Sequence, residues 1–167
     1  MVWVRSEYAG ELAVLSTWLS VFIPWNVTLS AVSQGTVLFV RFPLFQIRYT
    51  YGLPFARGTR LMDPLSALAF QSGTTIATAY RAWVLGAGLF ALALGFSIAY
   101  YLAEERVEAL AFDPVRLLGA LLGLTGVALA AATALLVTRG LPGTPIPIGV
   151  VFLFVFAGVL LTIERTD

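Results

Sequence analysis

The sequence predicts an all-α membrane protein: a four-transmembrane-helix bundle with a short β-hairpin-like extramembrane loop between helices 1 and 2. Its 167 residues are 59% hydrophobic and 11% charged, with a mean hydropathy of +0.91. A typical soluble domain is about 45–50% apolar and about 25% charged. Uncharged residues also form long windows, and a helix needs about 20 residues to cross a bilayer. We expect a single membrane domain over residues 1–167, with spans at about 12–31, 76–102, 115–138 and 146–163 and an extramembrane loop at 32–74.

The first span is predicted from the uncharged stretch that follows Glu11. Its apolar residues are densest up to Pro24, and Trp18 and Trp25 are typical of aromatic anchors at a membrane interface. A cleaved signal peptide is the alternative, but no small-residue cleavage site follows the apolar run. We therefore expect a retained helix.

Two Asp-Pro pairs indicate where helices begin. In Asp113-Pro114, the aspartate is a good N-cap and the proline fits the first helical turn, just ahead of the third span. Asp63-Pro64 repeats the pair before an apolar run that is too short to cross a membrane. The second pair therefore predicts a short helix at the interface or on the bundle.

Small residues at helical spacing predict where the spans pack together. Glycine and alanine let membrane helices approach closely, and residues three or four apart share a helix face. This pattern favours an antiparallel hairpin of the second and third spans, with a homodimer contact as the alternative. The predicted helix-packing residues are Gly119, Gly123, Gly126, Ala130, Gly88 and Gly95.

The loop between the first two spans reads as β structure. Phe45, Ile47, Tyr49 and Tyr51 alternate with polar residues, which is the period of a half-buried strand. A second strand is predicted at Val37–Phe42. We expect a two-stranded hairpin, or one bent strand, that rests its aromatic face on the membrane surface or on the bundle.

The same loop is rich in arginine. It holds four arginines and a single acid, Asp63. These arginines would contact lipid phosphates or the chain's own carbonyl groups; the alternative is a docking face for an acidic partner protein. The predicted contact residues for a partner or for lipid are Arg41, Arg48, Arg57, Arg60, Phe45 and Tyr49.

The composition excludes most kinds of catalytic and metal-binding site. The chain has no histidine and no cysteine, and no acidic or basic residue falls within 82–102, 117–138 or 140–163. Ionisable residues at bilayer depth mark ion paths and proton relays, so pumps and ion exchangers are disfavoured. We predict no catalytic residues, no cofactor, no metal site and no nucleic-acid partner, and therefore no enzyme.

Membrane orientation is predicted from two opposed arguments. Arginines near the span ends favour an exterior N-terminus under the positive-inside rule. Four-helix membrane proteins with a β-containing first loop display that loop outside, and this architectural analogy favours both termini inside the cell. We expect a multi-pass protein of the cell membrane with its N- and C-termini inside.

All ten basic residues are arginine, and several short segments are distinctive: 1–9 (MVWVRSEYA), 39–43 (FVRFP), 48–56 (RYTYGLPFA), 63–67 (DPLSA) and 137–140 (VTRG). Together with the composition, these segments resemble an uncharacterised family of small haloarchaeal multi-pass membrane proteins. The resemblance implies an archaeal, halophilic source. It implies no activity, so no residue inherits a role from it.

The function expected from these features is that of a scaffold or accessory subunit without enzymatic activity. It would act through helix packing and through the aromatic and arginine-rich loop. Its expected partners are the lipid bilayer and either further copies of itself or another membrane protein. The alternative is a small-solute or lipid transporter or channel component. Its support is the glycine- and threonine-rich helices (Thr125, Thr133, Thr138) and the Pro/Gly-rich entry to the fourth span (Pro142, Gly143, Pro145, Pro147).

Overall fold

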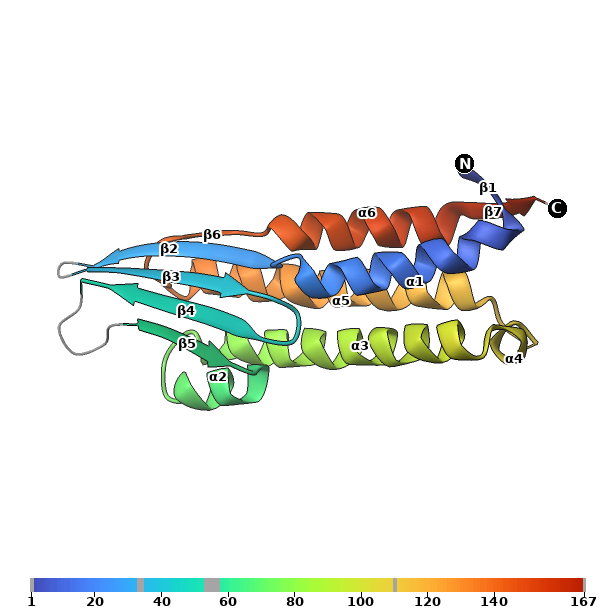
Figure 1. Ribbon diagram of the computed structural model, residues 1–167. Helices are drawn as coiled ribbons and strands as arrows, with labels where there is room; N and C mark the ends of the chain where they lie inside the picture. Colours follow the sequence, from blue (N-terminus) through green and yellow to red (C-terminus); the bar gives the residue numbers. More distant parts are fainter. Residues whose placement is uncertain (1, 33–34, 53–57, 110, 167) are drawn as a thin grey trace.

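Four helices lie side by side in the computed structural model, and a β-sheet extends from one end of them (Figure 1). The structure describes residues 2–32, 35–52, 58–109 and 111–166. The strands run roughly along the direction of the helices, so the molecule is elongated. The long helices are α1 (Ser6–Phe22), α3 (Ala77–Leu102), α5 (Pro114–Thr138) and α6 (Ile148–Thr162).

Helix α5 lies at the centre of the bundle. It packs along both α3 and α6, and α1 contacts all three of these helices. Phe90 of α3 and Leu118, Leu122 and Leu129 of α5 are fully buried in the shared core. The centre of the bundle is therefore filled with apolar side chains.

Two short helices connect the larger elements: the first lies between the last strand before α3 and α3 itself, and the second lies between α3 and α5. They are α2 (Pro64–Phe70) and α4 (Glu104–Glu108). Asp63 caps α2 by accepting hydrogen bonds from the backbone N–H groups of Leu65 (2.9 Å) and Ser66 (3.0 Å). Asp113 caps α5 in the same way, with Val115 N–H at 2.9 Å. Both predicted N-caps are confirmed.

The sheet has five antiparallel strands in the order β5-β4-β3-β2-β6. A separate two-stranded parallel pair, β1 (Val2–Arg5) with β7 (Ile163–Thr166), joins the two ends of the chain at the far end of the bundle (Figure 1). The strands of the large sheet are β2 (Asn26–Val32), β3 (Gly35–Arg41), β4 (Gln46–Tyr51), β5 (Gly58–Met62) and β6 (Thr144–Ile146).

The two faces of this sheet have the reverse of the usual polarity. Paired residues share a face, and the arginines of β3, β4 and β5 all lie on the face that packs against α3. The outer face is mainly apolar and carries no charge among its described residues. Its members are Val27, Leu29, Ala31, Thr36, Leu38, Val40, Ile47, Tyr49, Tyr51, Thr59, Leu61, Thr144 and Ile146.

The prediction of an all-α bundle of four transmembrane helices is wrong. Among the described residues, only α3 and α5 are long and apolar enough to cross a membrane by length and composition, while α6 is a shorter apolar helix. The described residues instead form six helices and a five-stranded antiparallel sheet. The expected first span over residues 12–31 fails because α1 ends at Phe22, and the residues after Pro24 form β2. Proline interrupts a helix, and the valine and threonine that follow favour strand geometry.

The expected two-stranded hairpin is also too small. Its two strands exist as β3 and β4, but they are the middle of a sheet that reaches β6, far along the chain. The face predicted to pack was the aromatic one. In the structure Ile47, Tyr49 and Tyr51 point outward, and Gln46 and Thr50 are buried instead.

Candidate functional site

The most unusual site lies where the inner face of the sheet meets the first turns of α3. Seven side chains there are at most 2% exposed, and five of them are polar or carry a polar group aimed into the cluster. We call this set the junction cluster. It consists of Trp25, Asn26, Thr28, Arg41, Gln46, Tyr80 and Trp83.

Arg41 lies at the centre of the junction cluster. Its Nη1 donates hydrogen bonds to Oδ1 of Asn26 and Oγ1 of Thr28, both at 2.9 Å. Its Nη2 donates to the hydroxyl of Tyr80 at 3.3 Å. The guanidinium also lies 4.6 Å from the centroid of the Phe39 ring. The register explains this geometry, because Arg41 pairs with Asn26 across β2–β3 and therefore shares its face.

The acceptors around Arg41 are also bonded to one another. The Thr28 hydroxyl donates to Asn26 Oδ1 at 2.8 Å, and the Tyr80 hydroxyl donates to Gln46 Oε1 at 3.5 Å. Two strands and α3 are thus linked through one guanidinium. Arginine suits this position because its planar fork presents donors in several directions at once.

The charge of Arg41 has no carboxylate counterpart in the described part of the chain. Its partners are neutral oxygens, and its Nε and the Nδ2 of Asn26 have no hydrogen-bond partner. The gap beside Arg41, between Trp25 and Tyr80, is too narrow for a water molecule. Burying a charge is costly unless it is paired or hydrogen-bonded. The site therefore concentrates positive potential inside the protein.

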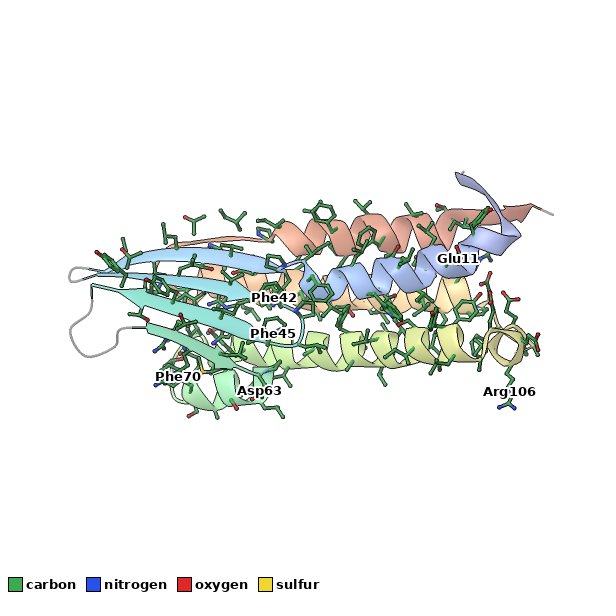
Figure 2. The ribbon with its side chains drawn as sticks, viewed as in Figure 1. Glu11, Phe42, Phe45, Asp63, Phe70 and Arg106 are labelled. Atoms are coloured by element: carbon green, nitrogen blue, oxygen red, sulfur yellow. The ribbon has the colours of Figure 1, made fainter. Side chains whose placement is uncertain are left out.

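Aromatic side chains frame the junction cluster. The Trp83 indole N–H donates to the carbonyl of Pro43 at 3.0 Å, which anchors the β3–β4 turn on α3. Trp25 and Trp83 lie with ring centroids 6.0 Å apart. In the turn itself, the rings of Phe42 and Phe45, both labelled in Figure 2, stack with their centroids 4.5 Å apart. These rings lie where the sheet and the helices meet.

The other predicted contact residues are spread over both faces of the sheet. Arg48 is half-buried on the inner face with its guanidinium 5.1 Å from the ring of Phe70 on α2, and Arg60 lies directly opposite it on β5. Tyr49 is exposed on the outer face. Arg57 lies outside the described residues. The three described loop arginines therefore share the inner face of the sheet and do not form one outward-facing docking surface.

The small residues of α5 face a different helix from the expected one. A Cβ on Gly119 would lie 2.9 Å from Cβ of Leu160, and one on Gly126 would lie 3.2 Å from the ring of Phe154; both neighbours belong to α6. The contact between α3 and α5 depends on Gly86, where a Cβ would lie 2.8 Å from a methyl group of Leu129.

The remaining predicted packing residues contribute less. Nothing lies within 4 Å of a Cβ built on Gly88 or Gly95. Gly123 is in ordinary contact with α6 through Ala157, and Ala130 is half-buried beside the core. Helices α3 and α5 do pack along each other, but the α5 glycines predicted to form that contact lie against α6.

Sequence reasoning missed most of the junction cluster. Asn26, Thr28 and Ser30 alternate with apolar residues, and this alternation indicates a polar strand face. The face was not recognised because the window was interpreted as helix. Tyr80, which accepts a hydrogen bond from Arg41, lies on α3 and is far from the strands in the sequence.

The arrangement offers few groups for reaction chemistry. In the described part of the chain, no group of three or more acids lies close enough to hold a metal ion. The pKa of Asp63 lies below its usual value, mainly because the Ser66 hydroxyl donates to its carboxylate, which reflects its capping role. The junction cluster can instead hold the sheet and the helices in a fixed relative orientation around a buried charge.

Comparison with known proteins gives a family but no activity. No curated protein matches the chain. A family model of unknown function matches residues 2–165, nearly the whole length. The chain therefore belongs to this family of unknown function, DUF7549.

Proposed function

We propose that the chain is a multi-pass integral membrane protein that acts as a scaffold without enzymatic activity and assembles with further copies of itself through the outer face of the sheet. The single observation that carries the proposal is the apolar, charge-free outer face. The haloarchaeal source and the orientation with both termini inside stay predictions. Because the chain has no cysteine, labelling of a cysteine introduced at the exposed Glu105 tests the orientation directly.

The membrane part of the proposal is supported by the surfaces of α3 and α5. Only 33% and 44% of their most apolar windows are buried within the protein. The other positions present leucine and valine outward; Leu85 and Leu92 of α3 are 62% and 64% exposed. A helix that is apolar all round is buried in a large core or in a membrane. Lipid is the environment that suits both helices.

The two ends of the bundle differ in charge. The termini and α4 lie at one end and the sheet at the other (Figure 1). The α4 end carries most of the described acids, including Glu104 and Glu105, while the sheet end carries Arg48, Arg60 and Arg139. Charged groups thus lie at the ends of the helices, and the uncharged middle of α3 has the length of a membrane span.

The scaffold part is supported by the outer face of the sheet. Exposed members of this face include Leu29 (60%), Tyr51 (70%) and Leu61 (67%). An antiparallel sheet with one face in water normally buries its apolar residues and exposes its polar ones. A contiguous exposed apolar patch marks an interaction surface. We therefore expect this face to pack against an apolar surface of a partner.

A second copy is the occupant that fits best. The described residues of the outer face carry no charge, so they match a second copy without any unpaired charge across a two-fold interface. An acidic partner would meet no arginine there, because Arg41 and Arg48 point inward. The strands run along the helix direction, so the face stands upright when the helices cross a bilayer and does not lie flat on the lipid (Figure 1).

The transporter alternative has less support. The hydroxyls of Thr125, Thr133 and Thr138 each donate to a carbonyl of their own helix, at 2.8, 3.0 and 2.9 Å. The donor proton of each hydroxyl is therefore engaged within its own helix. Leu122 and Leu129 fill the centre of the bundle at 0% exposure.

The test is the oligomeric state of matched variants in mild detergent and in nanodiscs. Leu61→Glu places a charge on the outer face, and Leu65→Glu places the same charge on α2 at an equally exposed leucine (67% and 66%). We expect the wild type and Leu65→Glu to be dimeric or larger and Leu61→Glu to be monomeric by native mass spectrometry. A wild type that is monomeric in both media, or a Leu61→Glu variant that still assembles, would overturn the proposal.

A further inference from the structure

A pocket lies at the opposite end of the bundle from the junction cluster, between α1 and the end of α3. Its volume is about 280 Å³. Glu11 and Glu104 line it together with the rings of Trp18, Tyr100 and Tyr101. Figure 2 labels Glu11 at this end of α1. The pocket thus combines aromatic walls with two carboxylates.

One wall of this pocket is a face of α1, and the opposite wall is the end of α3. Glu11, Leu15 and Trp18 are spaced at i, i+4 and i+7, so they share one face of α1. On the opposite wall, Tyr100 is buried, and a Cβ on Gly10 would lie only 2.6 Å from its hydroxyl oxygen. Gly10 therefore allows α1 to approach the tyrosine closely just beside the pocket.

The aromatic part of the wall is held in place. The Trp18 indole N–H donates to Oγ of Ser97 at 3.2 Å. The Tyr101 ring meets Trp18 edge to face, with centroids 5.4 Å apart and an interplanar angle of 62°. Tyr101 is itself 66% exposed, so part of its ring is open to a ligand. Aromatic faces attract cations, with tryptophan the strongest, and they are typical of sites for quaternary ammonium groups.

The carboxylates supply negative charge that the protein does not neutralise. Neither Glu11 nor Glu104 has an ion-pair partner in the described part of the chain, where the ion pair at this end joins Arg116 and Asp113. Both acids are exposed and remain ready to bind a cation. We propose that this pocket binds the ammonium group of a small organic cation, with Trp18 and Tyr101 against the alkyl groups and the two glutamates balancing the charge.

The size of the pocket limits the ligand. Its volume of about 280 Å³ lies just under the range of drug-sized sites, which begins at about 300 Å³. A trimethylammonium group fits this class, either as free choline or as a lipid headgroup. The headgroup is a natural source because Glu104 lies just beyond the C-terminal end of α3.

The test uses the full chain in a maltoside detergent, titrated with choline chloride at constant ionic strength and followed by calorimetry. We expect saturable binding of choline and none of 3,3-dimethylbutan-1-ol, its neutral isostere. A unit charge about 4 Å away in water contributes about fivefold in affinity, so Glu11→Gln and Glu104→Gln should each weaken binding by about that factor. Tyr101→Leu should weaken it about two- to fivefold.

Glu105→Gln is the matched control, because this exposed acid lies next to Glu104 but does not line the pocket. It should leave binding unchanged. Equal binding of the neutral isostere, or unchanged binding in the Glu11→Gln/Glu104→Gln double variant, would overturn the proposal, as would the absence of saturable choline binding.

Nanodiscs distinguish the two sources of the ammonium group. If lipid supplies it, choline should bind in phosphatidylglycerol discs and be excluded in phosphatidylcholine discs. If free cations are the ligand, choline should bind equally in both. Failure to bind in phosphatidylglycerol discs contradicts the proposal in either case. The scaffold proposal is tested separately, because strand β5, which carries Leu61, lies at the other end of the molecule (Figure 1).

Discussion

Replacement of Arg41 tests whether the junction cluster depends on the shape of the guanidinium or only on its charge. Arg41→Lys keeps a positive charge at a position that is 1% exposed. A single ammonium nitrogen cannot reach Asn26 and Thr28 on β2 and also Tyr80 on α3. Arg41→Met removes the charge and keeps an extended apolar side chain. The two variants therefore separate the hydrogen-bonding fork from the buried charge.

The expected magnitudes follow from the contacts of Arg41. A hydrogen bond to a charged group contributes about 1.5–3 kcal/mol, so the loss of at least one bond with the charge still buried should cost Arg41→Lys about 2–4 kcal/mol. Arg41→Met loses all three bonds, but it also removes the desolvation penalty. The bond from Thr28 to Asn26 at 2.8 Å remains. We expect Arg41→Met to cost only about 1–2 kcal/mol.

The assay is unfolding in a mild detergent by titration with sodium dodecyl sulfate, followed by tryptophan fluorescence. Trp25 and Trp83 lie in the junction cluster and report its loss directly. Arg48→Met is the control, because Arg48 is half-buried on the same face and its contact with Phe70 contributes about 0.5–1 kcal/mol. An Arg41→Lys variant at least as stable as Arg41→Met would refute the reasoning.

Two further predictions concern packing and pH. Gly119→Ala should destabilise the protein by about 1–3 kcal/mol because the added Cβ would press against α6. Gly88→Ala should raise the thermal midpoint slightly, because nothing lies within 4 Å of the added Cβ. Equal effects of the two substitutions would contradict the assigned α5–α6 contact. The Asp63 carboxylate accepts from Ser66, which lowers its pKa in the folded state. Its stabilisation is therefore present above the unfolded pKa and lost as the pH falls through the folded pKa. The difference in thermal midpoint between wild type and Asp63→Asn should shrink on acidification, and a constant difference would argue against this carboxylate as the cause.

Local patterns predicted the features that depend on neighbouring residues. The predicted second and third spans at 76–102 and 115–138 coincide closely with α3 (Ala77–Leu102) and α5 (Pro114–Thr138). Both helices are long and apolar with a single arginine in the first turns, and the Asp113-Pro114 pair marks the start of α5. The alternation from Phe45 to Tyr51 likewise predicted the strand β4. In each case the information lies within one contiguous segment.

The features that were missed depend on contacts between distant segments. The sequence of β2, taken alone, is compatible with the end of an apolar helix. Its strand geometry depends on pairing with β3 along one edge and with β6 along the other. Which face of the sheet is inside depends on Tyr80 and Trp83, which lie about 40 residues from the strands that they contact. A polar strand face normally faces water, so the sequence alone favoured the wrong side. The burial of Arg41 follows from that reversal and has no periodic pattern of its own.

The pairing of β6 with β2 sets an order of events during synthesis. β2 acquires its second neighbour only when Thr144–Ile146 has emerged, after α3 and α5 are already made. Until then one edge of β2 presents unpaired backbone groups, which are a template for pairing with other chains. Once in place, β6 closes that edge with only three residues, and Pro145 at its centre lacks an N–H to donate outward. The strand of this sheet that is translated last is therefore the one that closes the β2 edge.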